Sequence, residues 1–315
     1  MKNTVPIVFA FDNNLILPAC VCISSLLMNA NEDTFYDIFI LYSERVDLQR
    51  NELNKITEYY NNCRIQYRVV DATFDNAFEI RGITASTYYR LMIPELVPEY
   101  DKILYSDVDV IFREDLSGIY ETDMTGYYVA GVNSLSHLNK ATKQYYEQKL
   151  GINSSSIIYA GNILMNSALM LEDNIVSCFK EHVHTKYIYQ DLDILNIVCQ
   201  GKIKYLSPNF CLTTDISKYS SNYLSEVTDI WPVQEIKYAI KKGVVHYNGQ
   251  KPWKGYCINF DIWWEYYRKS PFFDEKFYFD YFYRKLNEYD LLPLWKRIKI
   301  LLRYFVYGRD LNRLD

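Results

Sequence analysis

The segment Lys102–Phe112, an apolar run interrupted by two aspartates, constrains this chain more than any other part of its sequence. Runs rich in Val and Ile on both sides of the aspartates are typical of a buried strand. Residues two apart on a strand point to the same side, so Asp107 and Asp109 could share one ion. Carboxylates beside an apolar core are unfavourable unless a cation neutralises them, and oxygen ligands suit Mg²⁺ or Mn²⁺. The alternative is a strand-end turn in which both aspartates cap backbone groups.

Short apolar runs alternate with helical patterns through the N-terminal part of the chain. The expected elements are strands at Pro6–Phe11, Tyr36–Tyr42 and Arg64–Val70, and helices at Leu15–Met28 and Leu48–Tyr60. This alternation predicts an α/β fold with a mostly parallel central sheet and crossover helices. Ligands of such sheets bind beyond the carboxyl ends of strands, where Asp12 and Asn14 lie. No glycine-rich phosphate loop follows the first strand, which disfavours a dinucleotide site.

The central part of the chain adds further elements around the aspartate pair. The expected elements are helices at Ser86–Pro94, Asn139–Leu150 and Gln190–Gln200, and strands at Tyr127–Val132 and Lys204–Leu206. Between them, the apolar run Ile157–Met165 contains Gly161, and a glycine within such a run permits close approach of the backbone to a ligand. Near the end of this part, Val244–Tyr247 is expected to form a strand that ends in a polar turn.

Composition limits the classes of function that this chain can have. Its 315 residues, 49% of them hydrophobic, suffice for one large domain. The net charge of −5 argues against a general nucleic-acid-binding protein. Seven cysteines without metal-ligand spacing indicate reduced thiols and a cytoplasmic protein. No apolar stretch of about 18 residues is present, so no membrane-spanning helix is expected.

His246 is the best candidate for a metal ligand among the four histidines. It ends an apolar strand that we expect to reach the same sheet edge as the aspartate pair. Imidazole can complete the coordination of Mn²⁺ beside carboxylates, and Lys251 would offer a point charge to a phosphate. The alternative for His246 is a core histidine with satisfied hydrogen bonds. His182 and His184 have lysines nearby and are expected on a solvated face.

Six blocks of the chain carry a more specific pattern. They are Ile7–Asn14, Thr87–Leu96, Tyr105–Asp109, Ala160–Gly161, Asp191–Asn196 and His246–Trp253. In this order they resemble glycosyltransferase family 8, the retaining GT-A-fold enzymes that include glycogenin and bacterial lipopolysaccharide galactosyl- and glucosyltransferases. An isolated Asp-x-Asp motif is weak evidence, whereas six ordered blocks are specific. The resemblance covers about residues 5 to 270. It implies a GT-A catalytic domain over residues 1–270 and a helical C-terminal extension over 271–315.

The resemblance implies a role for each matched residue. Asp107, Asp109 and His246 would bind Mn²⁺ or Mg²⁺. The residues implied at the reaction itself are Arg90, Asp191 and Asp193. A UDP-sugar donor would be bound by Ala10, Asp12, Asn14, Arg90, Asp107, Val108, Asp109, Ala160, Gly161, Asp191, Gly249 and Lys251.

The reaction that the resemblance implies is a Mn²⁺-dependent, retaining transfer of glucose or galactose. The donor would be the UDP-sugar, and the acceptor a cell-surface glycan such as lipopolysaccharide or capsule. Leu15, Tyr159 and Leu192 depart from the family, which often has Tyr, Asn or Asp, and Gln at these positions. They keep open a second interpretation, a catalytically impaired nucleotide-sugar-binding homologue that acts as a partner subunit.

The last part of the chain carries a net positive charge. Residues 291–315 contain six basic and two acidic side chains, a net charge of +4 on an otherwise acidic protein. On a helix, one face would carry Leu294, Ile298, Leu301, Leu302 and Phe305. A basic amphipathic helix with Trp295 is typical of a peripheral membrane anchor, here on the cytosolic face near a lipid-linked acceptor. The alternative is a terminal helix docked on the domain with its lysines solvated.

Overall fold

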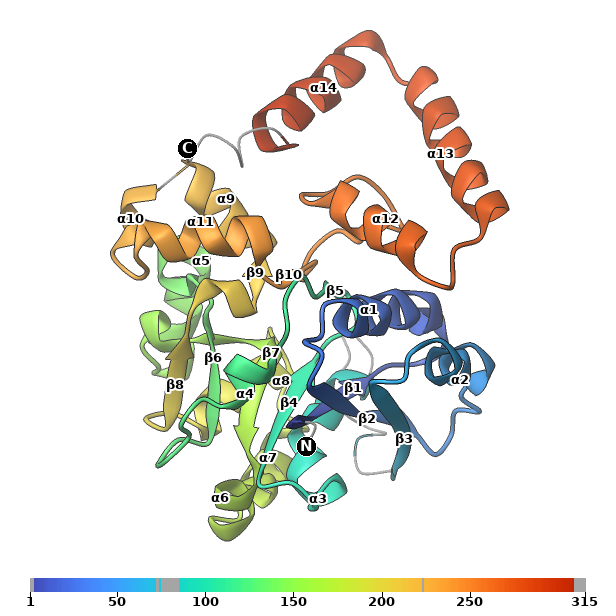
Figure 1. Ribbon diagram of the computed structural model, residues 1–315. Helices are drawn as coiled ribbons and strands as arrows, with labels where there is room; N and C mark the ends of the chain where they lie inside the picture. Colours follow the sequence, from blue (N-terminus) through green and yellow to red (C-terminus); the bar gives the residue numbers. More distant parts are fainter. Residues whose placement is uncertain (1–2, 72–73, 75–84, 223, 309–315) are drawn as a thin grey trace.

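The computed structural model describes residues 3–71, 74, 85–222 and 224–308. In these ranges a seven-stranded sheet with the order β3-β2-β1-β4-β7-β6-β8 forms the centre of the molecule (Figure 1). Four of the six strand pairs are parallel, whereas β7 runs antiparallel to both β4 and β6. The predicted α/β fold with a mostly parallel sheet is therefore confirmed. The strands are β1 (Asn3–Ala10), β2 (Thr34–Ser43), β3 (Cys63–Val70), β4 (Lys102–Ser106), β6 (Val129–Asn133), β7 (Ile158–Asn166) and β8 (Ile203–Leu206).

Strand β1 has an apolar core on both of its faces. Val5, Ile7 and Phe9 pack into one buried cluster, and Val8 and Ala10 pack into the other. A strand buried on both faces has a continuous apolar sequence rather than an alternating one, which is why this segment was recognisable. The first cluster includes residues of α1 (Ile16–Met28), α2 (Arg50–Tyr59) and α12 (Phe260–Lys269). The second includes residues of η3 (Ala85–Met92), α3 (Ile93–Leu96), α6 (Ser167–Glu172), α7 (Ile175–His182) and α8 (Asp191–Val198).

Two predicted helices have a different form in the structure. The segment predicted as one helix at 139–150 is a short helix α5 (Lys140–Gln144) followed by a π-helical turn η5 (Tyr145–Leu150). The rings of Tyr145 and Tyr146 both contact Tyr189, so this turn packs against the segment before α8. The segment predicted at 86–94 is mostly 3₁₀ helix, and Pro94 lies in the first turn of the regular helix α3, where its missing N–H is harmless.

A second, three-stranded sheet has the order β5-β10-β9. Its strands are β5 (Val110–Ile111), β9 (Leu212–Thr213) and β10 (Val245–His246). His246 ends a strand, as predicted, but that strand belongs to this second sheet and not to the sheet that contains β4. Two-residue strands carry no sequence periodicity, so their sheet could not be identified from the pattern. The remaining elements are η1 (Asn13–Leu15), α4 (Ser117–Tyr120), η4 (Ser136–Leu138), η6 (Ser154–Ser156), η7 (Pro208–Phe210), α9 (Thr214–Asn222), α10 (Leu224–Thr228) and α11 (Val233–Lys242).

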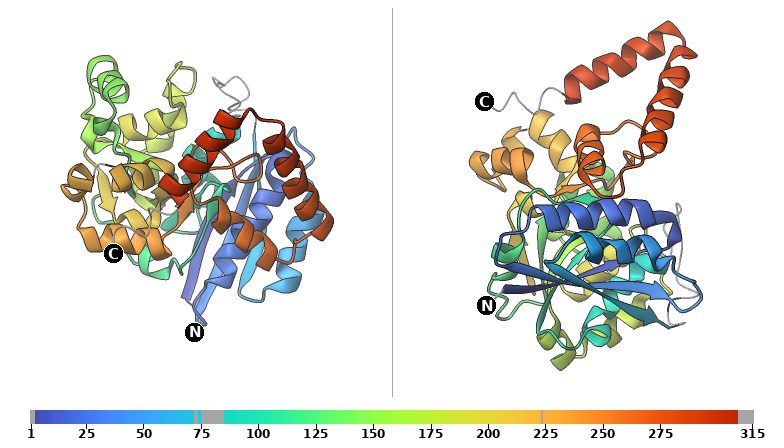
Figure 2. Two further views of the ribbon diagram at one scale, coloured as in Figure 1. Left: turned by 90° about the horizontal axis from the view of Figure 1, so that it is seen from above. Right: turned by 45° about the vertical axis from the view of Figure 1, so that its right-hand side comes forward.

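The C-terminal helices α13 (Glu275–Asp290) and α14 (Leu294–Gly308) extend away from the central sheet (Figures 1 and 2). Aromatic contacts hold the start of this extension, with the ring of Trp264 4.5 Å from Tyr281 and 5.0 Å from Phe282. On α14, in contrast, the side chains of Leu294 and Trp295 are 72% and 61% exposed. Residues 309–315, with two of the basic residues counted above, lie outside the described residues. Within the described ranges, no helix combines the length and the apolar character needed to cross a membrane.

Candidate active site

Backbone pairing brings the two aspartates and the histidine together from distant parts of the chain. Strand β4 ends at Ser106, and the next residue, Asp107, donates its backbone N–H to the carbonyl of Gly161 on β7 at 2.7 Å. Strand β5 begins directly after Asp109, and its Val110 pairs in antiparallel register with His246. The N–H of Tyr247 also donates to the carbonyl of Asp109 at 2.9 Å. The three side chains therefore meet where the two sheets join.

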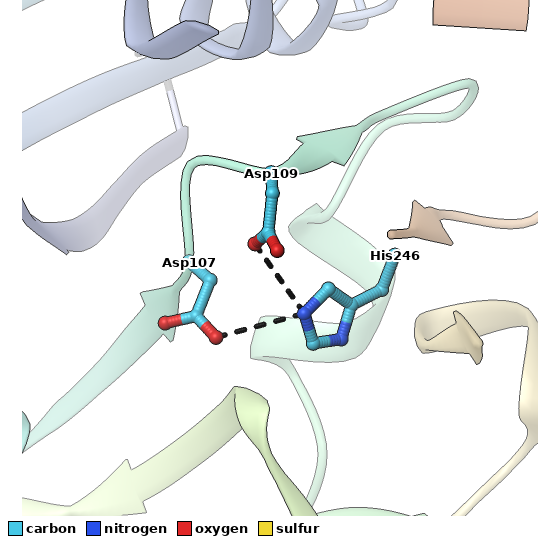
Figure 3. Close-up of side chains that lie close together, drawn as sticks. All are labelled: Asp107, Asp109 and His246. Carbon is cyan, nitrogen blue, oxygen red and sulfur yellow. Dashed lines mark ion pairs between the residues drawn. The ribbon is translucent and has the colours of Figure 1, made fainter. Parts of the chain in front are cut away.

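The side chains of Asp107, Asp109 and His246 converge on one point (Figure 3). His246 Nε2 lies 3.6 Å from Asp107 Oδ2 and 3.4 Å from Asp109 Oδ1. One ligand atom from each residue lies within 4.8 Å of the other two, as coordination of a single ion requires. Two carboxylates and one imidazole suit Mn²⁺, which accepts oxygen and nitrogen ligands. The residues present therefore fit a divalent cation.

Gly161 makes this convergence possible. A Cβ atom at this position would lie 2.2 Å from His246 Cε1 and 2.7 Å from Asp107 Oδ2, both closer than van der Waals contact allows. The imidazole has little room to retreat, because its Nδ1 faces the buried Sγ of Cys211 at 3.5 Å. Two candidate metal-binding side chains therefore pack closely against Gly161, and the approach of a bound ligand to this backbone stays a prediction.

The three groups also perturb one another electrostatically. Burial opposes a charge on His246, but the neighbouring Asp109 carboxylate outweighs burial and raises the His246 pKa to about 10. Burial alone would raise the pKa of Asp109, yet the charges of Lys251 and His246 hold it well below its usual range. The Lys251 ammonium pairs with Asp109 and donates to the carbonyl of Tyr247 at 2.7 Å. A metal bound at Nε2 would have to displace the His246 proton.

A buried arginine links this cluster to the start of helix α8. Arg90 donates to Asp107 Oδ1 at 2.8 Å and to the carbonyl of Ala160 at 2.6 Å, and its Nε lies 3.0 Å from Asp191 Oδ2. Burial, helped by the negative charge of Asp107, raises the Asp191 pKa to about 7 against the lowering effect of Arg90. Arg90 therefore fixes the positions of two carboxylates relative to each other.

All of these groups border one pocket of about 620 Å³. The predicted residues that line it are Ala10, Arg90, Asp107, Val108, Asp109, Ala160, Gly161, Asp191, His246 and Lys251. The three departures from the family pattern, Leu15, Tyr159 and Leu192, line it as well.

Four predicted site residues are not among those that line this pocket. Asp12 instead caps the turn η1, where its carboxylate accepts from the N–H of Asn14 at 2.9 Å. Gly249 is exposed in the turn after β10. Asp193 is fully buried and accepts from the hydroxyl of Tyr145 at 2.7 Å and the N–H of Tyr189 at 2.9 Å. Its carboxylate thus supports the segment before α8 rather than the pocket surface.

Sequence reasoning missed a group of polar residues in the same pocket. Ser134 and Ser136 lie around η4, and Asp215 opens α9. The hydroxyl of Tyr159 lies 3.4 Å from Asp215 Oδ2, and Asn248 donates to the same oxygen at 3.2 Å. Ser134, Ser136 and Asp215 belong to none of the six sequence blocks, so only their position in loops or at the start of a helix could have indicated them.

Comparisons with known proteins show what this chain is similar to. The model of the family described as Glycosyl transferase family 8 matches residues 6–257. A protein of Haemophilus influenzae described as a glycosyltransferase is 27% identical over 67% of this chain and 64% of its own length. Glycosyltransferase GlyB of Streptococcus pneumoniae is 22% identical over 84% of this chain and 62% of its own. The chain thus spans a little less than two thirds of these two relatives.

Among solved structures, the galactosyltransferase LgtC in complex with donor and acceptor sugar analogues has a similar fold. The match has a TM-score of 0.70 at 24% identity, over 86% of this chain and 98% of that one.

Proposed function

Because the chain belongs to glycosyltransferase family 8, we propose that it transfers a hexose, glucose or galactose, from a UDP-sugar to a cell-surface glycan such as lipopolysaccharide or capsule, with retention of configuration. The observation that carries the proposal is the pocket in which the cluster of Asp107, Asp109 and His246 adjoins Arg90 and Asp191. This combination places groups that can bind a diphosphate next to groups that can form hydrogen bonds with sugar hydroxyls.

In this proposal some residues of the chain bind the diphosphate leaving group and others bind the sugar. A divalent cation held by the three-residue cluster would neutralise negative charge on the departing diphosphate. Lys251 would leave Asp109 and pair with a phosphate, since its flexible stem allows it to reorient. Asp191 would accept hydrogen bonds from donor hydroxyls. Its carboxylate beside the anomeric carbon would also stabilise positive charge as the glycosidic bond breaks.

The proposal is tested by UDP release from a panel of UDP-sugars in the presence of Mn²⁺. We expect the wild-type protein to release UDP and Asp191→Ala to release none. Leu192→Gln should change the rate or the preferred sugar only modestly, because in this proposal the reaction does not depend on an amide at this position. Activity that appears only in Leu192→Gln would contradict the proposal and favour a catalytically impaired homologue.

We further propose that helix α14 attaches the protein reversibly to an anionic membrane surface, close to a lipid-linked acceptor. Its apolar side chains are exposed rather than docked, with Ile298 48%, Leu301 46% and Phe305 47% accessible. Lys296 and Lys299 are exposed beside them. Each basic residue near an anionic leaflet contributes about 1 kcal/mol, and burial of apolar surface adds about 25 cal/mol per Å².

Sedimentation with anionic liposomes at low and high salt tests the attachment. Full-length protein should sediment at low salt, whereas deletion of residues 291–315 should leave it in the supernatant with slow donor hydrolysis intact. Lys296→Glu combined with Lys299→Glu should weaken sedimentation mainly at low salt, because screening already removes this contribution at high salt. Full-length protein that stays in the supernatant at low salt, or a deletion that unfolds the domain, would show that the helix is structural.

A further inference from the structure

The two ring nitrogens of His246 have partners on different sides of the ring. Nε2 points toward Asp107 and Asp109 (Figure 3), at 3.6 Å and 3.4 Å. Nδ1 lies 3.5 Å from Sγ of Cys211, within reach of a hydrogen bond to sulfur, which is a weak acceptor. Cys211 is fully buried and is not among the residues that line the pocket. Any influence of this thiol on the site must therefore pass through His246.

Backbone pairing holds Cys211 and His246 next to each other. Cys211 directly precedes β9, and β9 pairs in parallel register with β10, so that Thr213 lies opposite His246. On the same segment, the N–H of Leu212 donates to the carbonyl of Val244 at 2.7 Å. These bonds fix the thiol relative to the imidazole without relying on the contact between the two side chains.

A buried asparagine holds the residue before Cys211. Asn162 is fully buried, and its side-chain N–H donates to the carbonyl of Phe210 at 3.0 Å. Its Oδ1 accepts from the hydroxyl of Ser106 at 3.1 Å, and Ser106 directly precedes the candidate ligand Asp107. One buried side chain thus connects the start of the cluster to the segment that carries the thiol.

A small apolar core residue is the alternative role for Cys211, since buried cysteines often serve only as that. In the described part of the chain, however, its Sγ is the hydrogen-bonding partner of His246 Nδ1. Gly161 packs so close to the ring that a Cβ there would lie 3.0 Å from Nδ1, which leaves little room for water to replace the thiol. An apolar residue at position 211 would then leave a buried N–H without an acceptor, which is unfavourable.

We propose that Cys211 is a positioning residue for the candidate cation site: its sulfur accepts a hydrogen bond from Nδ1–H of His246 and thereby keeps Nε2 directed at the two aspartates. This inference rests on the proposed function, because it requires the cation site, and it adds a residue outside the pocket. A histidine that binds a metal usually donates its other N–H to a neighbouring group, which sets the tautomer and the orientation of the ring. Neutral imidazole carries one N–H, so a proton fixed on Nδ1 leaves the Nε2 lone pair for the cation.

The Mn²⁺ affinity of the full-length protein, measured by electron paramagnetic resonance of free Mn²⁺ without UDP or sugar, tests this role. Cys211→Ala removes the acceptor and should weaken Mn²⁺ binding about tenfold, whereas Cys211→Ser keeps an acceptor and should stay within about threefold of wild type. Cys199→Ala is the matched control, because Cys199 directly follows α8 and is also fully buried. It should lower the melting temperature as Cys211→Ala does but leave Mn²⁺ affinity unaltered. Equal Mn²⁺ affinity in Cys211→Ala and wild type would show that the thiol only fills the core.

A second measurement observes the histidine itself. Protein labelled with ¹⁵N-histidine and loaded with Zn²⁺, a diamagnetic probe of the same site, gives long-range ¹H–¹⁵N NMR correlations that distinguish the two ring nitrogens. The signals of His246 are identified by their absence from His246→Gln. We expect the proton on Nδ1 and the metal on Nε2 in wild type and in Cys211→Ser, and a mixture of tautomers in Cys211→Ala. Metal on Nδ1 in the wild-type protein would overturn the inference, even if Cys211→Ala did not fold.

Failure of the proposed function has a different signature. Wild-type protein that binds Mn²⁺ but releases no UDP from any UDP-sugar would count against the transferase, whereas the Mn²⁺ affinities and the NMR spectra still decide the role of Cys211. Wild-type protein that binds no Mn²⁺ would overturn the inference.

Discussion

Asp109→Asn is expected to abolish Mn²⁺-dependent binding of UDP while the fold remains intact. Asp109 Oδ1 lies 3.4 Å from His246 Nε2, and its other oxygen pairs with Lys251, so one carboxylate serves both the cation and the lysine. An amide of the same size keeps the packing but removes the charge. We expect UDP affinity with Mn²⁺ to fall by about a hundredfold, to the level measured with a chelator. Isothermal titration calorimetry with and without chelator measures both values.

The control for this change is Asp33→Asn, an equivalent substitution at an exposed residue before β2. It should leave UDP affinity and its dependence on Mn²⁺ unaltered. A circular dichroism spectrum and a melting temperature close to wild type are needed for both variants. If Asp109→Asn binds UDP as well as wild type in the presence of Mn²⁺, the assignment of this cluster as the metal site is wrong.

Gly161→Ala should have a comparable effect although it removes no functional group. The added methyl would lie 2.2 Å from the imidazole of His246, so either β7 or the histidine must move. Crowding of a packed interior costs about 1–3 kcal/mol, and displacement of His246 would separate it from the carboxylates. We expect a lower melting temperature together with loss of Mn²⁺ binding. Electron paramagnetic resonance of free Mn²⁺ measures that binding without any need for activity.

Gly118→Ala is the matched control, since a Cβ on Gly118 in α4 would meet no atom within 4 Å. It should keep Mn²⁺ binding and at least the wild-type melting temperature, because alanine favours helix over glycine. Wild-type Mn²⁺ binding in Gly161→Ala would mean that the cluster tolerates a shift of β7 and that the tight packing is incidental.

The residues that could be predicted from the sequence are those whose burial produces a recognisable pattern of apolar residues. β1 was recognisable because it is buried on both faces, and Asp107 and Asp109 because they interrupt such a run. The convergence of His246 with them was predicted, but not the small sheet that achieves it. That sheet depends on register between two-residue strands, and register is set by tertiary contacts rather than by a local pattern.

Other parts of the site produce no such pattern in the sequence. Asp191 and Asp193 were both predicted near the reaction, yet residues two apart on a helix face different directions, and only Asp191 reaches the pocket. Ser134 and Ser136 were missed because they look like ordinary loop residues in the sequence. A left-handed leucine is imposed by the hydrogen bonds around it, so Leu135 could not be recognised before the structure was known.

The candidate metal cluster spans two sheets, since Asp107 directly follows β4, Asp109 directly precedes β5 and His246 belongs to β10. In an unfolded chain His246 is far from the two aspartates, so only the folded protein can hold a cation with all three. Bound cation therefore adds to the free energy of unfolding, by an amount that grows with the logarithm of its free concentration. Proteases attack the opened chain, so they would remove the cation-free protein sooner. Divalent cation supply would then govern how long each molecule survives, as well as how fast it works.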